Sequence, residues 1–446
     1  MRSIVRGGFE ISQFRPTGSS ASEVVADVEA AVREGRLQPG AALPAVRTLA
    51  ADLGLSPATI ASAYRELRVK GVARGHRRAG TRITGAPPTA PRPPLVVPSG
   101  VRDLLVGAPD PELLPPISVP PTGPVSPRLY GDPPMSPALA VEAAGRLGAD
   151  GIDSSHLAVV GGALDGVERV LGAWLRPGDH VAVEDPGYAP LLDLLAAMDM
   201  PVVPVALDDF GARPDSLAQA LARGCAAAVF VPRAQNPTGA AWNQARAEEL
   251  AAVLAAHPDV LVVEDDHAAE VAGAPAFTVT AGRRRWVTVR SASKSLSPDL
   301  RLAVLAGDAV TIARVEGRQA LGTGWVSYLL QETVAALWRD PAVGQLLARA
   351  AAVYQRRREI LIAELAARGI SASGMSGLSV WIPVPDELSV TSGLLGRGWA
   401  VAPGERFRIA SPPGIRVGIG TMTADEARRL AEDVSACLTF RPRRAE

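Results

Sequence analysis

Residues 260–267 read VLVVEDDH, and residues 286–301 read WVTVRSASKSLSPDLR. Each stretch opens with apolar and β-branched residues and ends in polar ones. Apolar runs of this length are typical of strands buried on both faces of a parallel sheet. Ligands of open parallel sheets lie at the carboxyl ends of the strands. The two stretches therefore predict an α/β fold with Asp265 and Lys294 at the same edge of the sheet.

Further β-rich runs precede these two stretches and alternate with helical segments. The β-rich runs are 180–185, 201–207 and 226–232, and the helical segments include 214–223 and 243–257. This alternation predicts a mainly parallel sheet with helices on both faces. From about residue 345 to residue 446 the pattern predicts a smaller α+β lobe, which begins with an arginine-rich helix at 345–368.

The N-terminal part of the chain has a different pattern. Apolar spacing predicts helices at 20–34 and 43–53, and Ser56 is a suitable N-cap for a third helix that begins at Pro57. Two short strands around a basic, glycine-rich tip are expected within 71–85. Three helices followed by a hairpin make a winged helix-turn-helix, assigned to residues 1–84.

A proline-rich stretch follows this head. Residues 85–100 read GAPPTAPRPPLVVPSG, a composition typical of a semi-rigid linker. We assign the linker to 85–101 and the large domain to 102–446.

Length and composition narrow the class of protein. A chain of 446 residues with 47% hydrophobic and 21% charged residues is expected to form two or three globular domains. No apolar run is long enough to span a bilayer, and the first residues do not resemble a secretory signal. Cys225 and Cys437 have no disulfide or metal-ligand spacing around them. We expect a cytoplasmic protein without a membrane association or a bound metal.

Charge is distributed unevenly along the chain. The net charge is zero, but residues 1–85 carry an excess of basic residues. Seven basic residues are concentrated in a short segment: Arg65, Arg68, Lys70, Arg74, Arg77, Arg78 and Arg82. Such a patch on a small domain is typical of a polyanion binder, although a solvated surface is the alternative.

Lysine is almost absent. Only two of the 46 basic residues are lysines, Lys70 and Lys294. Arginine cannot form a Schiff base because its guanidinium stays protonated. Lys294 is therefore a candidate for amine chemistry, with chance retention as the alternative.

Four polar clusters fall at or just after the ends of predicted strands: EDPGY (184–188), NPTG (236–239), EDDH (264–267) and SASKSLSPDLR (291–301). Together they resemble the MocR subfamily of GntR-type transcription regulators, over nearly the whole chain. Members of this subfamily fuse a winged helix-turn-helix to a fold-type-I aminotransferase-like domain. The resemblance implies pyridoxal 5′-phosphate as cofactor, a double-stranded DNA operator, and a homodimer with head-to-tail exchange of the heads.

The resemblance also implies a role for each motif residue. Lys294 matches the lysine that forms an aldimine with the cofactor, and Asp265 matches the acid that pairs with the pyridine nitrogen. Because Glu264 and Asp266 flank Asp265, the assignment could shift by one position. Asn236 matches the asparagine that binds the phenolic oxygen, and Tyr188 matches the aromatic residue that stacks on the ring.

One position departs from the family pattern. His267 stands where the family has a tyrosine that also binds the phenolic oxygen. Histidine has a different reach, and its neutral form donates from one ring nitrogen alone. The departure puts the colour of the cofactor and catalytic competence in doubt, and a satisfied loop histidine is the alternative.

Other residues are expected to hold the phosphate and the substrate. The phosphate candidates are Gly162, Ala163 and Leu164 at a helix N-terminus, with Ser291, Ser293 and Arg301. Tyr130 in YGDP resembles a tyrosine that reaches the partner subunit's phosphate, although Met135 replaces a family glycine nearby. Arg416 matches the arginine that receives a substrate carboxylate. Core or surface packing is the alternative for Tyr188 and Arg416.

The head has its own candidates for DNA contact. The stretch LPAVRTLA resembles the LPSxR motif of the family. The candidates are Arg47, Ser56, Thr59, Arg65, Gly80 and Thr81. Pro57 replaces an arginine that reads a base in many relatives, which suggests altered specificity with the phosphate contacts retained.

Two functions remain open from the sequence. The first is a regulator whose large domain senses pyridoxal phosphate or an amino compound through an aldimine. The second is an active aminotransferase with a fused DNA-binding head. His267 favours the first, so we expect the site to serve sensing, with residual transamination permitted. A cofactor carrier without DNA binding conflicts with the basic segment 65–82.

Overall fold

The computed structural model describes residues 14–38, 40–69, 72–76, 80–83, 95–117 and 128–439. The chain divides into two units, Met1–Pro93 with Asp193–Pro201, and Pro94–Leu192 with Val202–Glu446. Part of the expected basic segment (Lys70, Arg77 and Arg78) and residues 85–94 of the expected linker lie outside the described residues.

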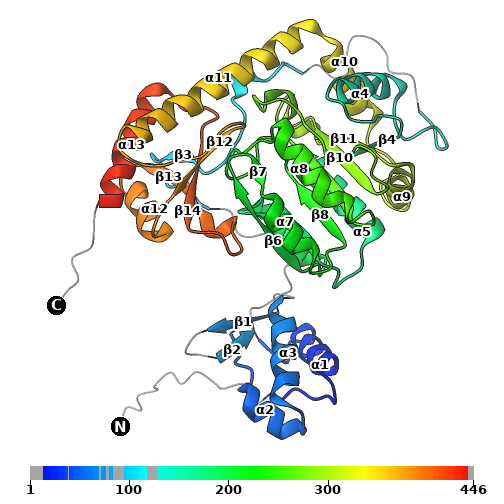
Figure 1. Ribbon diagram of the computed structural model, residues 1–446, viewed down its shortest axis with the longest axis vertical. Coiled ribbons are helices and arrows are strands. Elements are labelled where there is room, and N and C mark those ends of the chain that lie inside the picture. The colour runs from blue at the N-terminus through cyan, green and yellow to red at the C-terminus, as the bar shows by residue number, and fades with distance from the viewer. Residues whose placement is uncertain are drawn as a thin grey trace, which may run out of the picture. The chain divides into compact units, whose positions relative to one another are not determined.

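The head contains three helices and a hairpin, α1 (Ala21–Arg33), α2 (Val46–Leu53), α3 (Pro57–Val69), β1 (Ala73–His76) and β2 (Gly80–Ile83) (Figure 1). Its core is formed by apolar side chains at helical spacing, among them the buried Val24, Val28, Leu49, Ile60 and Leu67. The Ser20 hydroxyl caps α1 by accepting a hydrogen bond from the Glu23 N–H. The Tyr64 hydroxyl donates to the Pro44 carbonyl and joins α3 to the turn before α2.

The second helix of the head begins later than the sequence predicts. The expected helix starts at Leu43, whereas α2 starts at Val46. The Leu43 N–H is instead donated to the Thr81 carbonyl of β2. The chain at 40–43 thus lies beside the hairpin as an extended segment, and the Pro44–Ala45 step precedes the helix.

The large unit is built on an eight-stranded sheet. Its strands are β4 (Leu157–Val160), β5 (Val181–Asp185), β6 (Val202–Asp208), β7 (Gly211–Ala212), β8 (Ala227–Phe230), β9 (Leu261–Asp266), β10 (Trp286–Ser291) and β11 (Ala303–Gly307). The order across the sheet is β4-β11-β10-β9-β8-β5-β6-β7. The five strands from β10 to β6 are parallel, and β11 and β7 run antiparallel to their neighbours. The sheet is therefore mainly parallel, as predicted.

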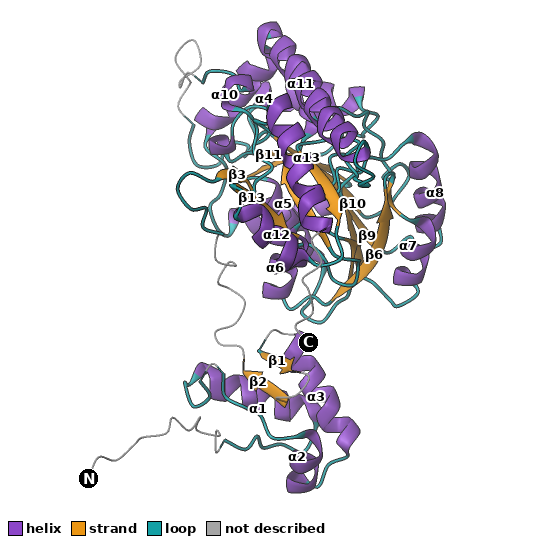
Figure 2. Cartoon of the chain, turned by 90° about the vertical axis from the view of Figure 1, so that its left-hand side faces the viewer, coloured by secondary structure: helices purple, strands orange, loops and turns teal. Residues whose placement is uncertain are grey.

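Helices lie on both faces of this sheet (Figure 2). Between residues 137 and 366 the chain forms α4 (Pro137–Ala149), α5 (Ala163–Trp174), α6 (Ala189–Ala197), α7 (Pro214–Leu221), α8 (Gln244–Ala255), α9 (Ala309–Ala320), α10 (Tyr328–Arg339) and α11 (Pro341–Ala366). Of these, α5, α7 and α9 pack directly on strands of this sheet. The central strands β5, β8, β9 and β10 are buried along their whole lengths, which explains their continuous apolar sequences. Short 3-10 turns add Pro111–Leu113, Ala269–Val271, Pro298–Leu300 and Gly404–Arg406.

The smaller lobe has a four-stranded sheet in the order β12-β14-β13-β3. Three of its strands are C-terminal, β12 (Ser379–Pro383), β13 (Trp399–Pro403) and β14 (Gly414–Gly418), and they are accompanied by α12 (Glu387–Leu395) and α13 (Ala424–Thr439). The fourth, β3 (Arg102–Leu104), pairs in parallel with β13. The lobe therefore includes residues from the start of the large unit as well as those after residue 345.

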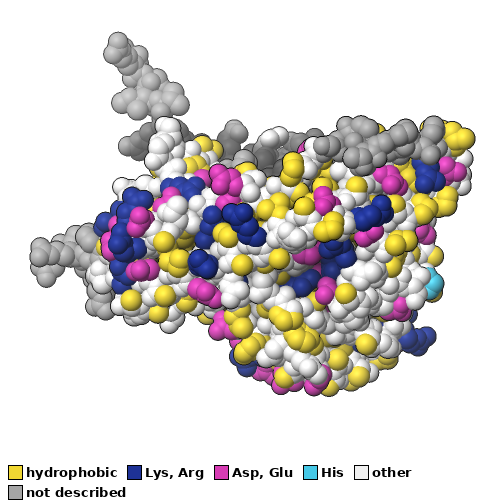
Figure 3. Space-filling model, turned by 90° about the horizontal axis from the view of Figure 1, so that it is seen from above, with side chains coloured by type: hydrophobic (Ala, Val, Ile, Leu, Met, Phe, Trp, Pro, Cys, Tyr) yellow, Lys and Arg dark blue, Asp and Glu magenta, His cyan; other side chains and the backbone are white. Residues whose placement is uncertain are grey.

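Surface charge is mixed on the face of the molecule seen in Figure 3, where basic and acidic side chains are interspersed among apolar ones. Many of the arginines of the large unit form ion pairs, such as Arg146 with Glu270 and Arg368 with Glu432. Within the described ranges, no helix is long and apolar enough to cross a membrane.

Truncating a core side chain of α5 should destabilise the large unit. Leu171 is fully buried, whereas Leu388 of α12 is 74% exposed. We expect Leu171→Ala to lower the free energy of unfolding by roughly 2–5 kcal/mol because it leaves a cavity. Leu388→Ala should change it by less than about 0.5 kcal/mol. Urea unfolding of both variants measures the difference, and equal effects would contradict the burial described.

Candidate functional site

A cavity of about 280 Å³ opens at the carboxyl ends of the parallel strands. It gathers residues from segments far apart in sequence, including the ends of β9 and β10 and the loop after β8. Of the predicted site residues, ten line it: Ala163, Leu164, Tyr188, Asn236, Asp265, His267, Ser291, Ser293, Lys294 and Arg301. Gly162 and Arg416 contact residues of this lining.

Lys294 follows β10 and is the lone lysine in the part of the chain that the structure describes. Its Nζ donates a 2.6 Å hydrogen bond to the Gly107 carbonyl. Burial, together with the charge of Arg416, lowers the pKa of Lys294 to about 8. An amine with this pKa is partly unprotonated near neutral pH, which is the form that attacks a carbonyl carbon.

The three consecutive acids at the end of β9 have different surroundings. Asp265 lines the cavity, and its Oδ1 is buried without a hydrogen-bond partner. Burial, with the charge of Asp266, raises the pKa of Asp265 to about 7. Glu264 instead accepts hydrogen bonds from Thr278, Thr288 and the Val279 N–H. Only Asp265 of the three presents a carboxyl group to the cavity.

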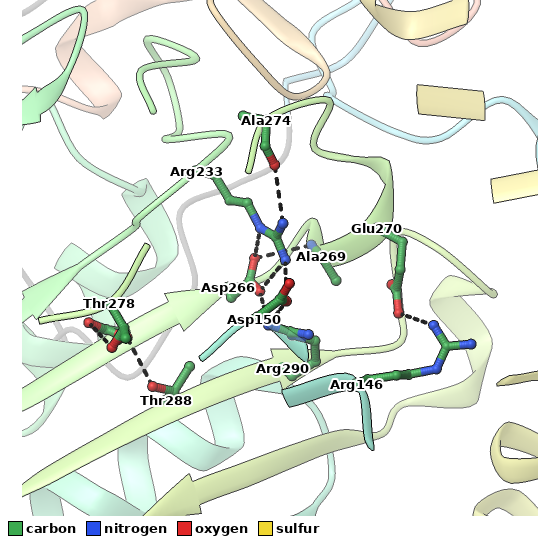
Figure 4. Close-up of polar contacts among 11 residues, drawn as sticks. Arg146, Asp150, Arg233, Asp266, Ala269, Glu270, Ala274, Thr278, Thr288 and Arg290 are labelled. Carbon is green, nitrogen blue, oxygen red and sulfur yellow. Dashed lines mark hydrogen bonds and ion pairs between the residues drawn. The ribbon is translucent and has the colours of Figure 1, made fainter. Parts of the chain in front are cut away.

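Asp266 belongs to a buried ion network beneath this edge of the sheet (Figure 4). Arg233 binds it in a bidentate manner at 2.9 and 2.8 Å. The Arg290 Nη2 lies 2.8 Å from Asp266 and 2.7 Å from Asp150. Although burial acts to raise the pKa of Asp266, the two arginines hold it at about 2. The network fixes the end of β9 and therefore the direction of the neighbouring Asp265.

One end of the cavity is suited to an anion. Gly162 is the N-cap residue of α5, and no side chain caps this helix. Gly162 has φ +117°, and a Cβ at this position would lie 3.1 Å from the Arg301 Nη2. A free helix N-terminus beside a guanidinium group binds phosphate. The Ser291 hydroxyl accepts the Ser293 N–H, so its own proton is available to a ligand.

Arg416 and Asn236 form a second polar pair at the cavity. The Arg416 Nη1 donates to the Asn236 Oδ1 at 2.9 Å, and its Nη2 donates to the Leu105 carbonyl. Its guanidinium lies 4.6 Å from the Phe407 ring, and its Nε is buried without a partner. The pair fixes the orientation of the Asn236 amide and leaves donor capacity on Arg416.

Two rings border the cavity. Tyr188 is half-buried, and burial, with the charge of Asp265, raises its pKa. The Nε2 of His267 lies 3.0 Å from the Ala234 carbonyl. Burial, together with the charge of Lys294, lowers the pKa of His267 to about 4.

Tyr130 does not reach this cavity. Its side chain is 93% exposed and makes an edge-to-face contact with Trp325, with 5.6 Å between ring centroids. Met135, in contrast, packs against the core of the large unit.

Several lining residues were not predicted from the sequence. They are Gly107, Ala234, Gln235, Gly239, Ala268, Pro298, Ser376, Leu378 and Ser379. Gln235 is buried and orders the loop after β8, since it donates to the Pro186 carbonyl and accepts from Thr238. Its position next to Asn236 was the one feature of the sequence that could have indicated that Gln235 lies at the site. Gly107 and Ser376 come from distant segments with no chemical motif.

In the head, most of the predicted DNA contacts are on the surface. Arg47, Ser56, Arg65 and Gly80 are exposed, and Thr59 and Thr81 are half-buried. The Ser56 hydroxyl accepts the Thr59 N–H and therefore caps the start of α3. The exposed positions include residues of α2, α3 and the hairpin.

Two family models match the chain. Residues 126–434 match the class I and II aminotransferases, and residues 20–83 match the bacterial regulatory proteins of the gntR family. These matches confirm the predicted winged head and fold-type-I aminotransferase-like domain.

Curated proteins with the same arrangement are similar over most of the chain. The vitamin B6 salvage pathway transcriptional repressor PtsJ of Salmonella typhimurium is 36% identical and spans 94% of this chain and 99% of its own length. The HTH-type transcriptional regulator TauR of Rhodobacter capsulatus is 28% identical and spans 84% of this chain and 87% of its own length.

Solved structures share the fold of the large unit. Kynurenine aminotransferase of Pyrococcus horikoshii superposes with a TM-score of 0.66 at 21% identity, over 77% of this chain and 92% of that chain. LysN, an α-aminoadipate aminotransferase of Thermus thermophilus, gives 0.65 at 18% identity, over 76% and 92%.

Adding a methyl group at Gly162 should weaken anion binding. The new Cβ would displace Arg301, and the left-handed backbone would be strained. Gly178 has a similar φ, +93°, with open space around it, so Gly178→Ala is the matched control for strain. We expect Gly162→Ala alone to weaken binding of pyridoxal phosphate, measured by equilibrium dialysis. Equal losses in both variants would exclude a specific role for Gly162.

Replacing Asp265 with asparagine should change the pH dependence of stability. Its pKa is about 7 in the folded protein and about 4 when unfolded, so the folded state binds the proton more tightly. This group therefore costs stability as pH rises from about 4 to 7, and the loss persists above that range. In ligand-free protein, the urea midpoint of Asp265→Asn relative to wild type should increase with pH. A difference that stays constant with pH would contradict the prediction.

Proposed function

Because the chain belongs to the class I and II aminotransferase family and carries a head of the gntR family of bacterial regulatory proteins, we propose that it is a transcription regulator that binds pyridoxal phosphate. The observation that carries the ligand assignment is that Lys294 and Asp265, whose Oδ1 has no partner, line the same cavity. Both groups are costly to bury without a ligand that matches them.

The residues present fit this cofactor. Lys294 supplies the amine for its aldehyde, and the Asp265 carboxylate pairs with a protonated ring nitrogen. Arg301 and the N-terminus of α5 hold the phosphate. When bound, the group supplies an electrophilic carbon and a positively charged ring that withdraws electrons. The solved LysN structure contains a phosphopyridoxyl compound, which agrees with this assignment.

The head would bind double-stranded DNA through exposed side chains. Arg47 lies in the first turn of α2, and Arg65 lies on α3. Contacts of these arginines with phosphates position the protein, and base contacts from the same surface select the sequence. A regulator of this kind acts where the chromosome is, so we assign it to the bacterial cytoplasm.

We further propose a homodimer with head-to-tail exchange of the heads. Apolar side chains are exposed in and just before α4 and in α10: Leu129, Tyr130, Val141 and Leu329. Since Tyr130 is exposed and does not line the cavity of its own chain, it is available to the cavity of a second copy. Burial of such a patch is the usual reason for association.

The effector would be pyridoxal phosphate itself or its product with a small amino compound. PtsJ is a repressor of vitamin B6 salvage, which favours the cofactor as the signal. Binding can shift the regulator only through a difference in affinity between its two states. Arg416, whose Nε has no partner, offers a second contact to an amino compound that carries a carboxylate.

An active aminotransferase is the second candidate. It is favoured by the presence of Lys294, Asp265, Asn236 and Arg416 around one cavity. Repeated turnover of amino donors to keto products, followed in a stopped-flow spectrometer, would establish the enzyme. A stable complex without turnover would establish the sensor.

The regulator predicts DNA binding that depends on Arg47 and on salt. We expect Arg47→Ala to weaken binding to the DNA upstream of its own gene and to reduce the salt slope by about 1 if one phosphate contact is lost. Arg176→Ala, an exposed arginine of the large unit, should have no effect. Fluorescence anisotropy at several salt concentrations measures both.

Substitution of each lysine tests whether DNA binding depends on pyridoxal phosphate bound at Lys294. Pyridoxal phosphate should change the DNA affinity of wild type and of Lys70→Arg, whereas Lys294→Ala should not respond. Borohydride reduction should label only the peptide that contains Lys294. Retention of the response in Lys294→Ala would exclude covalent sensing, and no DNA binding by wild type would exclude the regulator.

A further inference from the structure

His267 and Asn236 both border the cavity, and each is held by a contact that decides which hydrogen-bonding group it presents. We propose that His267 presents a hydrogen-bond acceptor, so that the site binds a ring oxygen that keeps its proton. The proposal rests on the proposed function and concerns the pyridoxal phosphate ring hydroxyl.

The first step concerns the tautomer of His267. Its Nε2 lies 3.0 Å from the Ala234 carbonyl. A carbonyl oxygen can only accept a hydrogen bond, so Nε2 must carry the proton. Because burial lowers the pKa of His267 to about 4, the ring is neutral near pH 7. Its Nδ1 then carries no proton and is an acceptor.

The second step concerns the rigidity of that contact. Ala234 has φ +55°, an uncommon conformation for a residue with a side chain. Its N–H donates to the Ser376 hydroxyl at 2.7 Å, and the adjacent Arg233 is bound to Asp266. The backbone at Arg233 and Ala234 is thus held by these two contacts. Rotation of His267 to present an N–H to the cavity would lose the hydrogen bond between Nε2 and the Ala234 carbonyl.

The third step concerns Asn236. Arg416 donates to its Oδ1 at 2.9 Å, so the amide oxygen is engaged and the NH₂ group is the available end. The cavity therefore offers one donor, from Asn236, and one acceptor, from His267. A hydroxyl group matches this pair, since it accepts one hydrogen bond and donates another.

A tyrosine at position 267 would change the hydrogen-bonding groups that the cavity offers to the ring oxygen. Tyrosine and Asn236 would present two donors, which match an ionised ring oxygen. In this chain the acceptor on His267 would keep the proton on the ring oxygen, so the Lys294 nitrogen would not carry that proton. Absorption should therefore lie mainly in the near ultraviolet, with little of the visible band that a protonated nitrogen gives.

The spectrum of the loaded protein tests the inference. We expect His267→Tyr to raise the ratio of visible to near-ultraviolet absorbance by about fivefold or more, since one hydrogen bond is worth roughly 1 kcal/mol. His267→Phe, which lacks both donor and acceptor, should give an intermediate ratio. Identical ratios in wild type and both variants would overturn the assignment.

A second measurement needs no ligand. The chain has five histidines, and ¹⁵N-labelled histidine distinguishes the two neutral tautomers by chemical shift. The His267 resonance, assigned as the one lost in His267→Phe, should show a protonated Nε2. A protonated Nδ1 would overturn the inference.

The outcomes separate this inference from the proposed function. If wild type binds no pyridoxal phosphate, the proposed function fails and the inference fails with it. If the cofactor binds to Lys294 but the wild-type spectrum is dominated by the visible band, only the role of His267 fails.

Discussion

The ion network around Asp266 is the constraint on which the site depends. Buried charges are tolerated when they are paired and hydrogen-bonded, and Asp266 is paired with Arg233 and Arg290. These contacts hold the end of β9 and the loop after β8 in one arrangement. Since Asp265 is next in the chain, its side chain must point to the opposite face of the strand, where it has no partner. The network thus fixes the position of the Asp265 carboxyl group, which can then bind a ligand in the cavity.

Much of the fold could be predicted because burial leaves a simple pattern. The central strands are buried on both faces and read as continuous apolar runs, and α3 begins where Ser56 predicts it. The start of α2 could not be predicted, because it depends on the pairing of Leu43 with β2. The pairing of β3 with β13 joins segments about 300 residues apart, and no local pattern indicates it.

The site was predictable where chemistry limits the choice of residue. Lys294 was indicated by the scarcity of lysine, and the acids after β9 by their place at a strand end. The sequence could not show which of the three acids faces the cavity. The choice depends on Arg233 and Arg290, which bind Asp266, and nothing in the sequence distinguishes these two arginines from the others. Gly107 and Ser376 contribute backbone and hydroxyl contacts, which leave no recognisable pattern in a sequence.

The use of arginine has a practical consequence for chemical modification. Apart from Lys294, every basic side chain other than histidine in the described ranges is a guanidinium. Reagents that acylate primary amines would therefore leave the ion pairs of the large unit intact while neutralising the single amine in the cavity. Mass spectrometry of partly acylated protein could then report the accessibility of that one nitrogen while the arginine ion pairs stay in place.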